Sequence, residues 1–234
     1  MNLKGIKMSF TITGGMSFIG GMQGQSPLPA IGTQTQGGYI GAYISLNQDG
    51  VATHQLIVSP KASGYTTMAY ISGSGSLNTL SNKIDGPTNT NTLFAQPSTY
   101  IAAAYARNLN IGGYTDWYLP AFYEIEAIYY NLKPNTTNNY EGSIDGIDLG
   151  VNPYAVPKRT TAWTASGAPF QTSVTAFQTS NSETYAGAPF PPWYVTSNSG
   201  GGSLIFMNFD AGGFSGFTGG TSTFPVRAIR RVAL

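Results

Sequence analysis

The stretch GGYTDWYLPAFYEIEAIYYNLKP, residues 112–134, carries the clearest structural signals in the chain. Its two glycines predict a tight turn, and Pro120 suits the first turn of a helix. Apolar side chains then recur with helical spacing, at Phe122, Ile125, Ile128, Tyr129 and Leu132. Lys133 and Pro134 end this pattern, because proline disfavours helical backbone in the residue before it. The stretch therefore predicts a glycine turn followed by a helix over residues 120–132.

A second helix is predicted just upstream, in PSTYIAAAYARNLN, residues 97–110. Its apolar stripe consists of residues at every fourth position, Ile101, Tyr105 and Leu109. Such spacing places one face of a helix against a core. Ser98 or Thr99 can cap the N-terminus by accepting a backbone hydrogen bond.

Strands are predicted before these helices. Residues 37–46 (GGYIGAYISL) and 53–61 (THQLIVSPK) are rich in β-forming residues. The Asp49-Gly50 pair between them is a hairpin signal. The following segment, residues 72–92, is dominated in its first half by Gly and Ser and is predicted as a loop.

The helical signal ends after residue 134. Residues 203–210 (SLIFMNFD) and 224–234 (FPVRAIRRVAL) are predicted as strands, the second closing the domain. Asn, Thr, Ser, Gly and Pro fill the segments between them, which we expect to be long loops. Two early helices followed by strands and loops predict an α+β fold.

The chain has 234 residues, of which only 9% are charged and 41% hydrophobic, with a net charge of +1. A core is possible without cross-links, and a polar surface with few charges is typical of extracellular or virion proteins. No cluster of Lys and Arg exists to neutralise phosphates, which disfavours nucleic acid as a partner. No apolar run approaches the length that spans a membrane.

The chain contains no cysteine and one histidine, His54. Disulfides, thiol catalysis and metal sites built from several histidines are therefore excluded. We expect His54 to be a strand or surface residue. The first twenty residues lack a continuous apolar segment, so they make a poor signal peptide. A protein that works outside the cell without one can be released by lysis, as phage particles are.

Two regions are predicted along the chain. Residues 1–25 contain short strand-like runs separated by glycines, and residues 26–38 are rich in Pro, Gly, Gln and Thr. We therefore assign residues 1–37 to an arm and linker for attachment or oligomerisation, and residues 38–234 to one globular domain.

Three spaced motifs resemble a known family. They are residues 112–134, AVPKRTTAWTAS at 155–166 and FPVRAIRRV at 224–232. Together with the strands predicted at 37–46 and 53–61, these motifs and their order along the chain resemble a loop-rich C-type-lectin-like domain. That domain occurs in tailed-phage virion proteins and bacterial adhesins. The matching positions are Gly113, Tyr114, Asp116, Trp117, Leu119, Pro120 and Glu124, then Val226, Arg227 and Arg230.

The resemblance implies two helices, a small twisted antiparallel sheet and long loops, with a role in surface binding or particle architecture. The chain departs from the family in its segment PPWYVTSNSGGG, residues 191–202, where the Trp is displaced and glycines are inserted. The calcium signatures of sugar-binding animal lectins are absent, so the resemblance implies neither calcium nor sugar.

The first motif offers structural candidates. Asp116 can accept backbone N–H groups at a turn, or else contact a ligand. Trp117 is expected to fill the core between the two helices and the sheet. Glu124 is expected to hold Arg227 or Arg230 in a bidentate pair that locks the C-terminus. Glu124 and Glu126 point apart at this spacing, which disfavours a glycosidase pair.

Residues 139–152, NYEGSIDGIDLGVN, are acidic. Asp145 and Asp148 are weak candidates for calcium ligands, since their spacing lacks the density of a dedicated loop. The alternative is a solvated acidic loop. We predict no metal and no cofactor.

The aromatic and amide-rich segments at 188–202 and 208–220 are the binding candidates, and we expect both to be loops. The candidate residues are Trp193, Tyr194, Asn198, Asn208, Phe214 and Phe217. Aromatic rings can stack on sugars, and small polar groups can hydrogen-bond to hydroxyls or to a protein. The alternative is that these rings fill the core or a contact with another subunit.

The resemblance, together with the charge-poor composition, implies a phage virion protein, tail-fibre-like or a fibre tip, that binds a glycan or protein of the host surface. The alternative is an architectural protein that decorates the capsid or tail through protein contacts alone. Residues 1–37 would contact other virion proteins or form a homo-oligomer, a trimer by analogy with fibres. Enzymes on the lectin-like fold use cysteines or metal ligands, so we predict no enzymatic activity and no catalytic residue.

Overall fold

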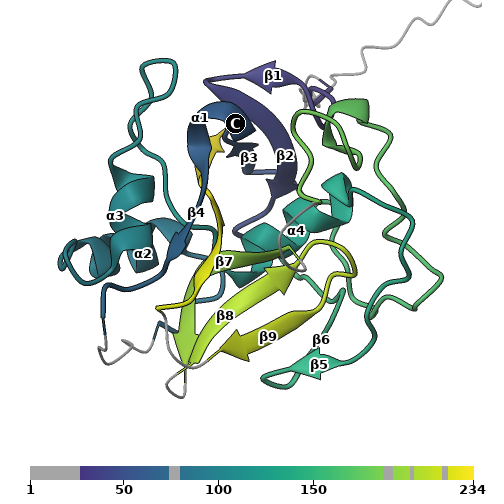
Figure 1. The fold of residues 1–234 in the computed structure, drawn as a ribbon. Helices are drawn as coiled ribbons and strands as arrows, with labels where there is room; N and C mark the ends of the chain where they lie inside the picture. Colours follow the sequence, from purple (N-terminus) through teal and green to yellow (C-terminus); the bar gives the residue numbers. More distant parts are fainter. Residues whose placement is uncertain (1–26, 74–79, 187–191, 201–202, 218–220) are drawn as a thin grey trace, which may run out of the picture.

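The computed structural model describes residues 27–73, 80–186, 192–200, 203–217 and 221–234. A four-stranded antiparallel sheet has its strands in the order β1-β2-β3-β11 and lies in the upper part of the view (Figure 1). The strands are β1 (Gln34–Thr35), β2 (Gly38–Ile44), β3 (His54–Val58) and β11 (Ile229–Ala233). The predicted hairpin and closing strand are thus confirmed. The closing segment bends between two strands, since β10 (Thr223–Arg227) pairs instead with β4 (Tyr65–Ala69).

The four-stranded sheet separates two hydrophobic clusters. Ala42, Ile44, Leu56 and Val58 belong to the cluster of helix α4 (Phe122–Leu132). Ile40, Tyr43 and Ile57 belong to the cluster of helix α3 (Ile101–Arg107). Because neighbouring side chains along a strand alternate between faces, one sheet supports a helix on each side.

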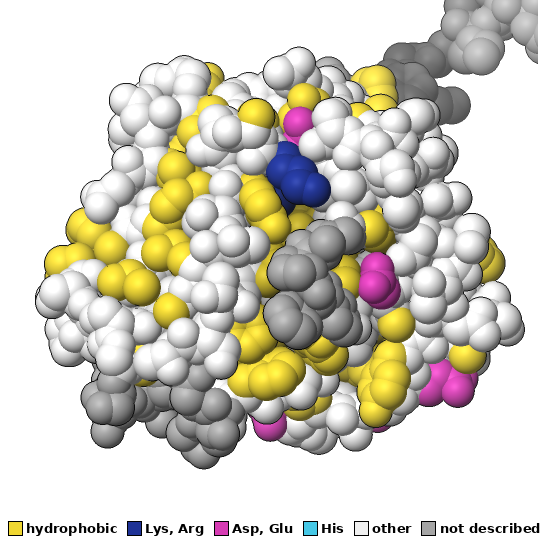
Figure 2. Space-filling model, viewed as in Figure 1, with side chains coloured by type: hydrophobic (Ala, Val, Ile, Leu, Met, Phe, Trp, Pro, Cys, Tyr) yellow, Lys and Arg dark blue, Asp and Glu magenta, His cyan; other side chains and the backbone are white. Residues whose placement is uncertain are grey.

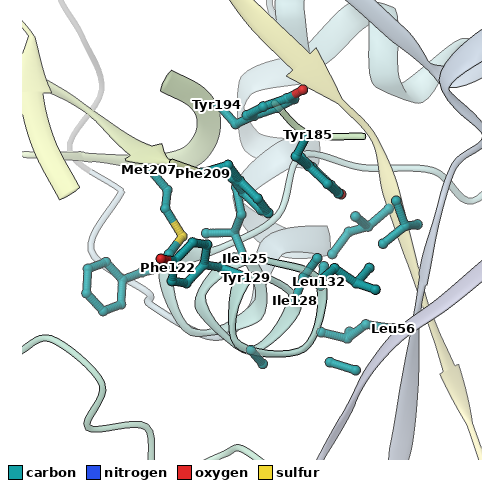
Figure 3. Packing of buried hydrophobic residues seen from close by; sticks show 14 of the residues in the cluster. Leu56, Phe122, Ile125, Ile128, Tyr129, Leu132, Tyr185, Tyr194, Met207 and Phe209 are labelled. Atoms are coloured by element: carbon teal, nitrogen blue, oxygen red, sulfur yellow. The ribbon is translucent and has the colours of Figure 1, made fainter. Parts of the chain in front are cut away.

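Helix α4 confirms the main sequence prediction. All five apolar positions named above are buried, and Figure 3 shows the helix with Leu56 on one side and Met207 and Phe209 on another. The helix begins at Phe122 rather than Pro120, with Ala121 as N-cap. Ala121 has no side chain that can accept a hydrogen bond, but the carboxylate of Glu124, at the third helical position, accepts the Ala121 N–H at 2.9 Å.

The other helices correct the prediction in two ways. Helix α3 begins at Ile101, and its N-cap is Tyr100, so neither Ser98 nor Thr99 caps it. Helix α2 (Gly86–Phe94) occupies the end of the segment predicted as a loop. Its N-cap is Asp85, whose side chain accepts hydrogen bonds from the backbone N–H and hydroxyl of Thr88. A short α1 (Lys61–Gly64) and a 3-10 helix (Thr175–Phe177) complete the described helices.

A second sheet lies beside the first and corrects the predicted loops. Strands β7 (Trp193–Gly200), β8 (Ser203–Asn208) and β9 (Phe214–Phe217) form an antiparallel meander (Figure 1). The short strands β5 (Ser143–Ile144) and β6 (Ile147–Asp148) form a separate hairpin. The fold is α+β as predicted, with more helices and sheets than the two-helix scheme.

Residues 27–37, predicted as the end of the linker, lie against the domain. Strand β1 pairs with β2, and the Tyr43 hydroxyl donates to the carbonyl of Pro29 at 2.6 Å. Leu28 and Ile31 pack against the hydrophobic clusters. The strand-like runs predicted at 1–25 lie outside the described residues, and the attachment role of the arm stays a prediction.

Candidate binding site

The motif at 112–120 forms a structural corner. Gly113 has a φ of +85°, which suits glycine, and its neighbour Gly112 also has a positive φ. Trp117 is fully buried and donates its indole N–H to the carbonyl of Tyr114 at 2.9 Å. It packs in the cluster of α3, not between α3 and α4 as predicted, because α4 lies on the other face of the sheet.

The end of the corner is tied to its neighbours through the backbone. The Leu119 N–H donates to the Thr90 hydroxyl of α2 at 3.1 Å. The carbonyl of Pro120 accepts the N–H of Ser197 in β7 at 2.8 Å. The Tyr118 N–H donates to the carbonyl of Ile229 in β11 at 2.9 Å, so the corner joins the two sheets and α2, which is a structural role.

The predicted pairing of Glu124 with Arg227 or Arg230 is wrong. Arg230 is paired with Asp116, its Nη2 lying 3.0 Å from Asp116 Oδ2. Arg227 is paired with Glu183, and its Nη2 lies 2.5 Å from Glu183 Oε2. Each of these arginines has its own carboxylate because the two side chains leave the chain on different strands, β10 and β11.

Glu124 instead belongs to a buried network. It accepts the Tyr118 hydroxyl at 2.7 Å, and Arg231 Nη1 lies 3.6 Å away. Burial raises the pKa of Glu124 to about 7, although the Arg231 charge and the hydrogen bonds act in the opposite direction. Glu126 bonds to a separate set, Asn152 and Arg159, as expected from side chains that point apart.

The acidic hairpin does not gather ligands for a metal. Asp145 occupies its turn, and its carboxylate lies 3.5 Å from Lys83 Nζ. Asp148 lies in β6 and is exposed. Nowhere in the described part of the chain do three His, Cys, Asp or Glu side chains come close enough to hold an ion.

Two of the six predicted binding residues serve the interior. Tyr194 is 2% exposed and packs against Tyr185, with ring centroids 4.8 Å apart. Asn198 accepts the Phe122 N–H at 2.8 Å and donates to the carbonyls of Leu80 and Asn82. Neither side chain is presented to solvent, because β7 is covered on both sides.

Phe217 also packs within the protein. Its ring lies 5.1 Å from that of Phe206 and 5.2 Å from that of Phe224. Trp193 closes this group, with its ring centroid 5.6 Å from that of Phe217 in an edge-to-face arrangement. The aromatic group fixes the orientation of the partly exposed Trp193.

The structure brings the remaining three candidates together. Trp193, Asn208 and Phe214 line a pocket of about 250 Å³, together with Tyr140 and the β8–β9 turn. We call it the aromatic pocket. Tyr140 is 59% exposed, so its ring is open to a ligand. None of the side chains that line the pocket is charged.

The position of Tyr140 is set by its backbone. Its N–H donates to the carbonyl of Ala211 at 2.7 Å, and its carbonyl accepts the indole N–H of Trp163 at 2.7 Å. Gly213 approaches the ring so closely that a Cβ there would lie 3.3 Å from Tyr140 Cγ. These contacts hold the ring beside the β8–β9 turn.

The pocket also offers polar groups. Asn208 Oδ1 accepts the N–H of Asp210 at 2.7 Å, which fixes the amide plane. Among the described residues, Asn208 Nδ2 donates no hydrogen bond and the Ser215 hydroxyl makes none. A ligand in the pocket therefore meets an aromatic ring and unpaired hydrogen-bonding groups.

The sequence did not identify Tyr140, whereas Ala211, Gly213 and Ser215 lie within the segment 208–220 that was predicted to bind a ligand. Tyr140 is separated from Trp193 by more than fifty residues and follows a polar run, so no local pattern identifies it. Figure 2 shows one face of the molecule, where hydrophobic and uncharged polar side chains dominate and few charged ones appear.

No helix in the described residues combines the length and apolar character needed to cross a bilayer. No protein-family model, no curated protein and no solved structure matches this chain.

Proposed function

We propose that this chain is a saccharide-binding domain of a phage virion protein, with a C-type-lectin-like arrangement of its α+β elements. The observation that carries the binding role is the aromatic pocket, where the exposed ring of Tyr140 lies near Trp193 and the free amide N–H₂ of Asn208. Assignment to a virion rests on the resemblance of the three spaced motifs and on the charge-poor composition.

The lining favours an uncharged sugar. Sugar rings present C–H groups on their faces and hydroxyls on their edges, which matches an aromatic wall flanked by amide and hydroxyl groups. The pocket is small, so it suits one or two sugar units rather than a long chain. Binding at such a site is weak for one copy, and several copies on one particle would strengthen it through multivalency.

The test is glycan-array binding by the full chain and by Tyr140→Ala, whose exposed ring contributes little to folding. We expect this change to weaken binding at least tenfold, and Trp193→Ala to abolish it. Phe170→Ala is the matched control, since Phe170 is 69% exposed and lies outside the aromatic pocket. Unchanged binding by Tyr140→Ala would refute the proposal.

An architectural role is the second candidate. It is favoured by the internal use of Tyr194, Asn198 and Phe217, which leaves fewer aromatic groups for a ligand. A structure of the assembled particle distinguishes the architectural role from the saccharide-binding role. Burial of Tyr140 between subunits would favour decoration of the capsid or tail, whereas an exposed Tyr140 would favour host attachment.

A further inference from the structure

A second pocket lies apart from the aromatic pocket and has a different character. It has a volume of about 350 Å³ and shares no lining residue with the aromatic pocket. Its lining includes Lys158, Arg159 and three threonines, with Tyr130 at one side. Two neighbouring cations are notable in a chain with only 9% charged residues.

Arg159 is held in one position. Its guanidinium carbon lies 4.1 Å from the centroid of the Tyr130 ring, and its Nε donates to the carbonyl of Gly150 at 3.2 Å. Its Nη2 is paired with the buried carboxylate of Glu126. Among the described residues Nη1 has no hydrogen-bond acceptor, so this group is fixed in place and free to donate.

Lys158 supplies charge that no carboxylate neutralises. Within the described part of the chain it forms no ion pair, and its Nζ donates only to the carbonyl of Gln48 at 3.2 Å. Since Glu126 offsets Arg159, the described residues that line the pocket and their ion-pair partner carry one net positive charge.

Hydroxyl groups complete the lining. Thr160, Thr161 and Thr164 are exposed, and their hydroxyls make no hydrogen bond among the described residues. Charged and neutral donors converging on one pocket favour an oxyanion, because a carboxylate accepts several hydrogen bonds at once. Hydroxyls of the same ligand can pair with the threonines.

We infer that this pocket is an anion-accepting subsite for the carboxylate of an acidic sugar, with Lys158 and Arg159 as its donors. The inference concerns residues separate from those of the aromatic pocket. The loss of one site therefore leaves the other intact, and the two proposals fail independently.

The experiment is an NMR titration of the full chain with methyl galacturonide, and with methyl galactoside as the neutral control. We expect saturable amide shifts at residues 158–164 with the acid and none with the neutral sugar. Equal binding of the two sugars, or shifts confined to other segments, would overturn the inference. So would sodium sulfate binding as tightly as the galacturonide, since that indicates an adventitious ion only.

Two variants test the charged donor Lys158 and the hydroxyl of Thr161 without removing the Arg159–Glu126 pair. Lys158→Gln and Thr161→Val change exposed side chains, so both should fold. We expect each to weaken galacturonide binding about threefold or more, as is typical of one exposed polar contact. Lys83→Gln removes the same charge elsewhere and should bind as wild type does. Wild-type affinity of both test variants would contradict the inference.

Discussion

Arg230 in the last strand and Asp116 in the corner before α4 form an ion pair between residues 114 positions apart, with Nη2 3.0 Å from Oδ2. Arg230 also lies over the ring of Tyr114, 4.0 Å from its centroid, and donates to the carbonyl of Gln36 at 2.8 Å. One side chain therefore connects the C-terminal strand, the glycine corner and the segment before β2.

We expect Arg230→Ala to lower the free energy of unfolding more than Asp116→Asn does. The Asp116 side chain is 54% exposed, so Asp116→Asn should lower the free energy of unfolding by about 0.5–1 kcal/mol. Arg230→Ala also loses the contacts with Tyr114 and Gln36, and we expect about 2–3 kcal/mol. Urea denaturation of both variants measures the difference. Equal losses would show that the ion pair is the whole contribution of Arg230.

Among the C-terminal arginines, we expect substitution of Arg227 to lower the free energy of unfolding the most. It is 2% exposed, donates to Ser59 and Glu183, and lies 4.6 Å from the Tyr185 ring centroid. Arg227→Ala leaves the Glu183 carboxylate buried without its partner, which should lower the free energy of unfolding by about 3–5 kcal/mol.

A double-mutant cycle tests this pair. Arg227→Met combined with Glu183→Gln removes both charges, so the double variant should be less unstable than the sum of the two single variants. Chemical denaturation at neutral pH measures all four proteins. Strict additivity would mean that Arg227 acts through packing alone.

Glu124 should make stability depend on pH. Its pKa in the folded protein is raised by burial to about 7, above its ordinary value near 4.5. The folded state therefore holds a proton that the unfolded state releases, and the free energy of unfolding falls as pH rises from 4.5 through 7. The loss amounts to at most about 3 kcal/mol.

Glu124→Gln removes this contribution while keeping a group that accepts the Ala121 N–H. We expect the loss of stability between pH 5 and pH 8 to be smaller in the variant than in wild type, measured by urea denaturation at both pH values. Glu141→Gln, at an exposed position, is the control and should keep the wild-type slope. An unchanged slope in Glu124→Gln would disprove the assignment.

Gly212 should tolerate no side chain. It has a φ of +74°, and a Cβ there would lie 2.4 Å from Tyr129 Cε1 in the core. We expect Gly212→Ala to lower the free energy of unfolding by about 2–4 kcal/mol, combining backbone strain with a steric clash. Because Gly212 lies in the turn beside Tyr140, saccharide binding at the aromatic pocket should weaken too.

Gly113→Ala separates the effect of backbone strain from that of the steric clash. Gly113 has a φ of +85°, but nothing lies within 4 Å of the position of its Cβ. This variant should therefore lose only about 1 kcal/mol, the cost of the left-handed backbone. Equal destabilisation of the two variants, measured by thermal unfolding, would mean that the contact with Tyr129 relaxes without cost.

Elements with strong local patterns were predictable from the chain alone. Helix α4, the β2–β3 hairpin and the closing strand each display a periodicity or turn signal within about a dozen residues. Helix α2 lacks such a signal, because its sequence GPTNTNTLF has few strong helix formers. Its Asp85 cap and its contact with the corner at Leu119 stabilise it instead.

The second sheet was also not predictable from local sequence patterns. Strand β7, WYVTSNSG, contains Ser, Asn and Gly, which suggest a loop when considered without their neighbours. In the folded protein the Thr196 hydroxyl donates to the carbonyl of Ile205, and the Ser197 N–H donates to Pro120. Polar residues are stable in this buried strand because partners distant in sequence satisfy them.

The candidate site follows the same division. The sequence indicated the residue types of the site, aromatic rings with amides, and three of its members. It also indicated the core face of α4 and the corner at 112–120. The pairing of each arginine with its carboxylate, and the approach of Tyr140 to Trp193, arose only when the chain folded. Both depend on side chains from distant segments whose separation no local spacing encodes, and long-range packing sets that separation.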